Sequence, residues 1–130
     1  MLKFNKFNKF NININENQLL LFKRILILPK FIPWKEHLFN FEKINNLLGN
    51  CLYTIYFDST NNWKISSVPI KPSSFESRKK LPLEWCGLNG IELQKICNVN
   101  DAEFVHTQGF IAGASSIEGC IKMALKAVEY

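Results

Sequence analysis

The chain has 130 residues, of which 47% are hydrophobic and 21% charged, and its formal net charge is +5. This length is enough for one domain with a single modest core and hardly for two, while the apolar content excludes a wholly disordered chain. The mild basic excess is typical of proteins that bind nucleic acid or another polyanion.

Residues 1–18 form a low-complexity leader. The triplet Lys-Phe-Asn occurs three times, and six of these eighteen residues are asparagine. The leader has no helical period and little varied apolar surface, so it is expected to be disordered. Because it is basic as far as Glu16, a mitochondrial presequence is the alternative, although the leader lacks the arginine and serine that such signals favour. Residues 19–130 are expected to form the single folded lobe.

The folded part is expected to begin with a buried strand over residues 20–28, because charged residues and prolines interrupt any span long enough to cross a membrane. We expect no membrane association. A helix is predicted over 34–47, with Gly49 just beyond it in a left-handed conformation. Its apolar face at helical spacing would comprise His37, Phe41, Ile44 and Leu48.

A hairpin follows, with β-branched and aromatic strands over 51–57 and 63–70 joined by a polar turn. Residues 71–87 contain two prolines and the basic run Arg78-Lys79-Lys80, and are expected to form a long loop that is functional or loosely ordered.

Two further helices are predicted. Asn89 with Glu92 resembles a capping box that starts a helix ending near Cys97, and Ser115 with Glu118 resembles a second one that starts the last helix. A brief strand over 103–106 lies between them. The element order is therefore β-α-β-β-α-β-α, which predicts an α+β fold: a mixed sheet with helices packed on it.

The segment from His106 to Ser116 carries the candidate site. Glycines at 109 and 113 permit close backbone approach to a ligand, and the first amides of a helix favour an anion. His106 and the hydroxyls of Ser115 and Ser116 supply further donors. Neither the P-loop nor the dinucleotide pattern is present, so an ordinary turn with a capped helix remains the alternative. The same two interpretations, phosphate site or solvated basic loop, apply to Arg78 in its loop.

The sequence does not contain a complete hydrolytic site. Its carboxylates are scattered, and Glu36 and His37 diverge by about 100° on a helix, so they do not share a metal. The cysteines are too widely spaced for a zinc site, which predicts reduced, buried thiols in an intracellular protein. These cysteines are Cys51, Cys86, Cys97 and Cys120.

Four stretches together resemble the C-terminal part of the melanocyte-proliferating-gene family, also described as metal-dependent protein hydrolases related to the DHH phosphoesterases. The stretches are PWKEHLF at 33–39, WKISSVP at 63–69, PSSFESRKKLPLEW at 72–85 and FVHTQGFIAG at 104–113, the last followed by Glu118-Gly119. They occur in order from about residue 19 to the end of the chain.

The resemblance implies half of a two-lobed 3′–5′ RNA exonuclease of the nucleus or mitochondria. A divalent metal, Mn²⁺ or Mg²⁺, would be held by an N-terminal lobe that this chain does not contain. By the same resemblance, His106, Gly109 and Gly113 match a loop that contacts substrate phosphate, and Arg78 matches an arginine of the Ser-Ser-Phe segment. The family has Gly-Gly where this chain has Ala112-Gly113. The family motif at 34–37 has no role that we can assign.

Two functions follow as hypotheses. In the first, the chain is the RNA- or nucleotide-phosphate-binding lobe of the exonuclease, inactive alone and completed by a DHH catalytic lobe, possibly in trans. In the second, it is a non-catalytic interaction module without a nucleotide role, and its glycine segment is merely a turn.

Overall fold

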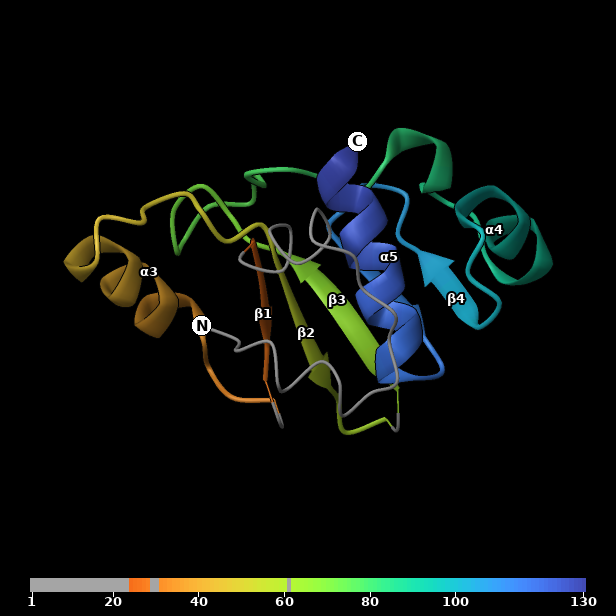
Figure 1. Cartoon of the computed structure of the whole chain (residues 1–130), viewed down its shortest axis with the longest axis horizontal. Helices are drawn as coiled ribbons and strands as arrows, with labels where there is room; N and C mark the ends of the chain where they lie inside the picture. Colours follow the sequence, from red (N-terminus) through yellow and green to blue (C-terminus); the bar gives the residue numbers. More distant parts are fainter. Residues whose placement is uncertain (1–23, 29–30, 61) are drawn as a thin grey trace.

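The computed structural model describes residues 24–28, 31–60 and 62–130 (Figure 1). The predicted disordered leader and the first part of the strand predicted over 20–28 lie outside these residues. Within the described ranges, no helix has both the length and the apolar character needed to cross a membrane.

The described residues form a five-stranded mixed sheet with helices packed on it. Its strands are β1 (Ile25–Ile27), β2 (Tyr53–Phe57), β3 (Trp63–Ser67), β4 (Ala102–Val105) and β5 (Ile111–Ala114). Their order is β1-β2-β3-β5-β4, with β1 parallel to β2 and the other neighbours antiparallel. The helices are α3 (Lys35–Ile44), the 3₁₀ turn η2 (Leu83–Trp85), α4 (Gly90–Cys97) and α5 (Ile117–Glu129). The predicted α+β class is confirmed.

Strand β5 corrects the predicted element order, because the sequence analysis assigned its residues to a glycine loop. The strand lies inside the sheet, where Ala112 pairs with Ile65 of β3 and Val105 of β4. Three of its four residues, Ala112, Gly113 and Ala114, are small and carry little strand propensity. Pairing on both sides and burial under α5 stabilise the strand instead.

The main core lies between the sheet and α5, which crosses the front of the sheet in Figure 1. Tyr53, Ile55 and Ile65 face this helix and are fully buried. Because side chains alternate along a strand, Tyr56 and Ser66 point to the opposite face. A second cluster forms around Tyr56 on that face, with Leu38 and Phe39 of α3 packed against it.

Helix α3 is shorter than predicted and buries a different face. It ends at Ile44, and its buried residues are Leu38, Phe39 and Glu42. The predicted apolar face is exposed instead: Phe41 is 45% and Ile44 82% exposed. Gly49 does have a positive φ of 87°, but the helix is capped earlier, at Asn45.

Both predicted capping boxes also need correction. Asn89 is the N-cap of α4 but makes no side-chain capping bond. The N-cap of α5 is Ser116 rather than Ser115, and its hydroxyl accepts a hydrogen bond from the Gly119 amide at 3.0 Å.

The four cysteines are free, and Cys51, Cys97 and Cys120 are buried, as the sequence analysis predicted, whereas Cys86 is half-buried. Burial raises the pKa of the Cys51 thiol to about 12 and that of Cys120 to about 12. A thiol reacts as its thiolate, so both are inert in the native protein.

We therefore expect iodoacetamide at pH 8 to modify Cys86 first, and Cys51 and Cys120 only after unfolding. Peptide mass spectrometry over time measures this order, with labelling in urea as the control. Modification of Cys120 in the native protein at the rate of Cys86 would contradict the packing described above.

Candidate functional site

A hollow of about 600 Å³, which we call the sheet groove, opens on the face of the sheet opposite α5. Tyr56, Ser66 and Ile111 contribute to it from three neighbouring strands. All four stretches that carry the family resemblance line it: Trp34 and Lys35 from the first, Ser66, Ser67 and Pro69 from the second, Ser74, Phe75, Ser77 and Lys80 from the third, and Gln108, Phe110 and Ile111 from the fourth. Residues far apart in sequence thus converge on one concave surface.

Hydrogen bonds from Ser67 hold the walls of the sheet groove together. Its hydroxyl lies 2.7 Å from that of Ser77, and it donates to the Phe110 carbonyl oxygen at 3.2 Å. The Ser67 amide donates to the same oxygen at 2.9 Å. The 72–85 loop and the turn before β5 are therefore both fixed to β3, which makes the groove a preformed feature.

The sheet groove carries positive charge. Lys35 and Lys80 are exposed, and no carboxylate is found among the described residues that line the hollow. The backbone beneath Lys80 is held because its carbonyl accepts a hydrogen bond from the Tyr53 hydroxyl at 3.1 Å. Two ammonium groups on an apolar, hydroxyl-bearing surface suit a ligand with phosphate and apolar parts.

The basic run 78–80 is divided between three environments. Arg78 makes a buried bidentate ion pair with Glu42 of α3, at 2.7 and 2.8 Å, and also donates to the Cys51 carbonyl at 2.8 Å. Lys79 donates to the carbonyl oxygens of Val128 and Tyr130 at the end of α5. Only Lys80 of this run lines the groove. Arg78, predicted to bind phosphate, is thus engaged within the fold.

His106 and Gly109 build the turn that leads into β5. The His106 Nδ1 accepts a hydrogen bond from the Gln108 amide at 3.0 Å, and its ring lies 4.5 Å from that of Phe110. Gly109 has a φ of 72°, and a Cβ there would lie 3.0 Å from the Cys86 sulfur. The imidazole thus borders the groove by positioning Phe110 and does not line it.

Gly113 and the two serines lie elsewhere. Gly113 is inside β5, where a Cβ would lie 2.7 Å from the ring of Phe104. The hydroxyls of Ser115 and Ser116 donate to the carboxylate of Asp101, which packs against Gly119. The start of α5, predicted to grip an external anion, therefore already carries a carboxylate of the protein itself.

Four residues that the tertiary structure brings to the groove were not predicted as site residues: Lys35, Phe75, Lys80 and Phe110. All four lie within the quoted stretches, so the signal was present, but their convergence was not readable from spacing. Phosphate binding by the predicted set stays a prediction; the set comprises Arg78, His106, Gly109, Gly113, Ser115 and Ser116. No group of three or more histidine, cysteine or acidic side chains capable of holding a metal occurs in the described ranges. These residues therefore do not provide a donor set for the divalent metal that the resemblance implies.

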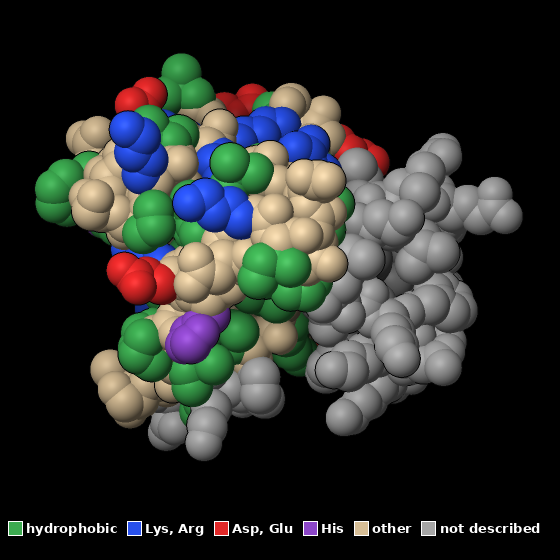
Figure 2. Space-filling view, turned by 90° about the vertical axis from the view of Figure 1, so that its left-hand side faces the viewer, with side chains coloured by type: hydrophobic (Ala, Val, Ile, Leu, Met, Phe, Trp, Pro, Cys, Tyr) green, Lys and Arg blue, Asp and Glu red, His purple; other side chains and the backbone are tan. Residues whose placement is uncertain are grey.

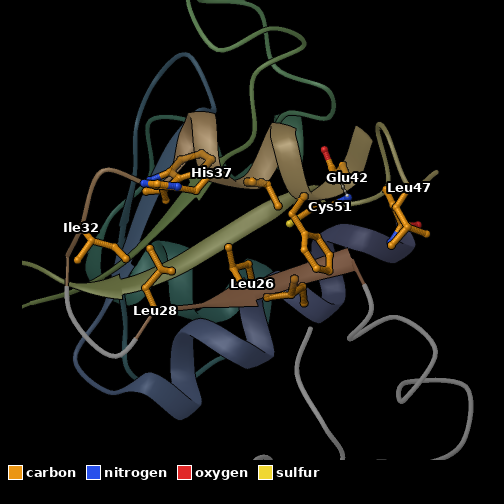
Figure 3. Close-up of a pocket in the computed structure, with 12 residues that line it drawn as sticks. Leu26, Leu28, Ile32, His37, Glu42, Leu47 and Cys51 are labelled. Atoms are coloured by element: carbon orange, nitrogen blue, oxygen red, sulfur yellow. Dashed lines mark hydrogen bonds between the residues drawn. The ribbon is translucent and has the colours of Figure 1, made fainter. Parts of the chain in front are cut away.

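A second hollow, of about 350 Å³, lies between α3 and the β1 edge of the sheet. Figure 3 shows Leu26 and Leu28 beneath it, with His37 and Ile32 at one end and Leu47 at the other. Figure 2 shows the α3 side of the molecule, where a histidine is surrounded by hydrophobic side chains. Phe41 of α3, which is also exposed to solvent, contributes to the lining of this hollow.

Comparison with known proteins identifies the family. The MYG1 exonuclease model, described as an uncharacterised protein family (UPF0160), matches residues 9–128. The chain belongs to the MYG1 family. It is 44% identical over 108 residues to a MYG1 protein of Caenorhabditis elegans, covering 81% of this chain and 32% of that one. It is 39% identical over 92 residues to the MYG1 exonuclease of Homo sapiens, covering 71% of this chain and 24% of that one.

The match to a MYG1 protein of Dictyostelium discoideum is 38% identical over 102 residues, or 78% of this chain and 31% of the relative. The chain thus spans 24–32% of the length of these MYG1 relatives. No solved structure matches the chain. The resemblance of the four stretches to this family is confirmed, and the family context is that of an exonuclease.

Proposed function

We propose that the chain is the substrate-binding lobe of a MYG1-family exonuclease and that its sheet groove holds the phosphates of single-stranded RNA. The observation that carries this proposal is the convergence of all four family stretches on one groove that bears Lys35 and Lys80. A concave surface that bears positive charge, with no carboxylate among the described residues that line it, suits a polyanionic substrate.

The proposal separates phosphate binding from cleavage, because the two tasks require different side chains. Binding phosphate requires the ammonium groups and hydroxyls that the groove provides, whereas metal-assisted cleavage requires clustered carboxylates and histidines. The described residues lack such a cluster. Cleavage would therefore depend on a part of the relatives, such as a DHH-like lobe, that this chain does not match.

An exposed apolar stripe on α3 fits the part of the proposal in which this lobe works beside a second, catalytic lobe. Phe41 lines the apolar hollow beside β1 and, with Ile44 about one turn further along α3, presents an apolar surface to solvent. A stripe of this kind is typical of a protein–protein contact. The stripe fits the second hypothesis, an interaction module without a nucleotide role, equally well. A measurement of RNA binding therefore distinguishes the two hypotheses.

We expect Lys80→Ala to weaken the binding of a short single-stranded RNA about three- to tenfold and to reduce the slope of log affinity against log salt by about 1. The physical reason is the loss of one phosphate contact and its released counterion. Fluorescence anisotropy at several salt concentrations measures both quantities, and incubation with Mn²⁺ is expected to yield no cleavage by this chain.

The matched control is Lys122→Ala, because Lys122 is an exposed lysine of α5, on the opposite side of the sheet from the groove. It removes the same charge and should leave the affinity nearly unchanged. If the two variants weaken binding equally, the attraction is non-specific. If the wild-type chain binds no RNA, the interaction-module hypothesis is favoured.

A further inference from the structure

Exposed phenylalanine rings surround the sheet groove. Phe75 is fully exposed, Phe31 is 56% exposed and Phe110 is 44% exposed. Exposed apolar side chains that gather in one place are typical of an interaction site, and here three such rings line one hollow. Phosphate binding alone gives no reason for them.

Two of these rings are held in place by aromatic neighbours. Phe31 contacts the ring of Tyr56 edge to face, with centroids 5.1 Å apart. Phe110 contacts the His106 ring at 4.5 Å, and its carbonyl accepts hydrogen bonds from Ser67. The rings of Phe31 and Phe110 are therefore preorganised around the hollow, which lowers the entropic cost of placing a flat ligand against them.

We infer that the sheet groove binds an unpaired nucleobase by stacking it on the rings of Phe75 and Phe110, while Lys80 and Lys35 hold the adjoining phosphates. This inference rests on the proposed function. A hollow of about 600 Å³ is within the range of small-molecule sites. Aromatic rings beside lysines are the usual means of binding single strands without reading sequence, since every base presents a flat face.

His106 then acts as a positioning residue. Its Nδ1 is occupied by the Gln108 amide, and its ring packs against Phe110, so it orients the stacking ring. The same arrangement selects against duplex RNA, because bases in a duplex are already stacked on each other and are not available to the groove.

The test compares a single-stranded RNA of about five nucleotides with a ribose-phosphate chain of the same length that lacks bases, by anisotropy with the full chain. We expect the RNA to bind at least about fivefold more tightly than the base-free chain and than duplex RNA of the same length. Phe75→Leu and Phe110→Leu, which remove the ring and keep an apolar side chain, should each remove most of this difference.

The matched control is Phe41→Leu, an exposed phenylalanine of α3 that lines the other hollow. It should leave binding unchanged. Equal affinities for RNA and the base-free chain would overturn the inference and leave the proposed function standing. A preference for bases that survives both groove variants, or that Phe41→Leu abolishes equally, would also overturn it. Absence of binding to either probe would overturn both proposals.

Discussion

Arg78→Ala is expected to lower the free energy of unfolding by about 3–5 kcal/mol, the largest effect of any single substitution that we predict. The Arg78 and Glu42 side chains are 7% and 3% exposed and form a bidentate pair. Removing the guanidinium leaves the Glu42 carboxylate buried without its charge partner. Urea unfolding followed by circular dichroism measures the loss.

The ion pair is also a structural joint. Glu42 belongs to α3, and its carboxylate accepts a further hydrogen bond from the Cys51 amide at 3.0 Å. Arg78 lies in the long loop and packs over the Phe39 ring at 4.5 Å. One guanidinium thus connects the helix, the approach to β2 and the loop, so its loss should also loosen the groove wall that this loop forms.

Two controls separate charge burial from other effects. Lys80→Ala removes a neighbouring but exposed cation and should change stability by less than about 0.5 kcal/mol. The double variant Glu42→Leu with Arg78→Met should recover most of the loss, because no charge is then left buried without a partner. A cost below about 1 kcal/mol for Arg78→Ala would show that the pair is solvated and refute this account.

Gly119→Ala is expected to destabilise the protein by about 2–4 kcal/mol, although glycine-to-alanine changes inside helices ordinarily stabilise by about 1 kcal/mol. An added Cβ would lie 2.7 Å from the Asp101 Cγ, which is closer than real Cβ atoms approach. The carboxylate must move, and it then loses the hydroxyls of Ser115 and Ser116. Thermal and urea unfolding measure the change.

The decisive experiment for Gly119 is a double-mutant cycle. Asp101→Ala alone should destabilise, because Asp101 anchors the start of α5. In that background, Gly119→Ala should become neutral or stabilising, since the helix propensity of alanine is no longer opposed by the carboxylate. If Gly119→Ala costs the same in both backgrounds, contact with Asp101 is not the reason for the glycine.

The sequence predicted the elements whose side chains carry a strong period or propensity. The aromatic and β-branched strands β2 and β3 and the amphipathic helix α5 were found within a few residues of their bounds. Strand β5 was missed because the residues of Ile111–Ala114 are mostly small, and its conformation depends on neighbours far away in the chain. Local propensity is weakest where tertiary pairing matters most.

Predicting contacts from charge had the same limit. Arg78, Lys79 and Lys80 are adjacent and basic, and of these three the sequence singled out Arg78 as the candidate phosphate contact. In the structure Arg78 pairs with Glu42, Lys79 contacts the end of α5, and Lys80 lines the sheet groove. Which lysine or arginine is free for a ligand depends on what the fold places opposite it.

The sequence by itself therefore determined the α+β class, the principal elements and the family, because these depend on local patterns and on four quoted stretches. Only the tertiary structure decided the location of the candidate site. It filled the predicted anion-binding helix start with the carboxylate of Asp101 and brought Lys35, Phe75, Lys80 and Phe110 to one groove. The physical reason is that both outcomes depend on contacts between distant segments, and no local pattern in a chain specifies those contacts.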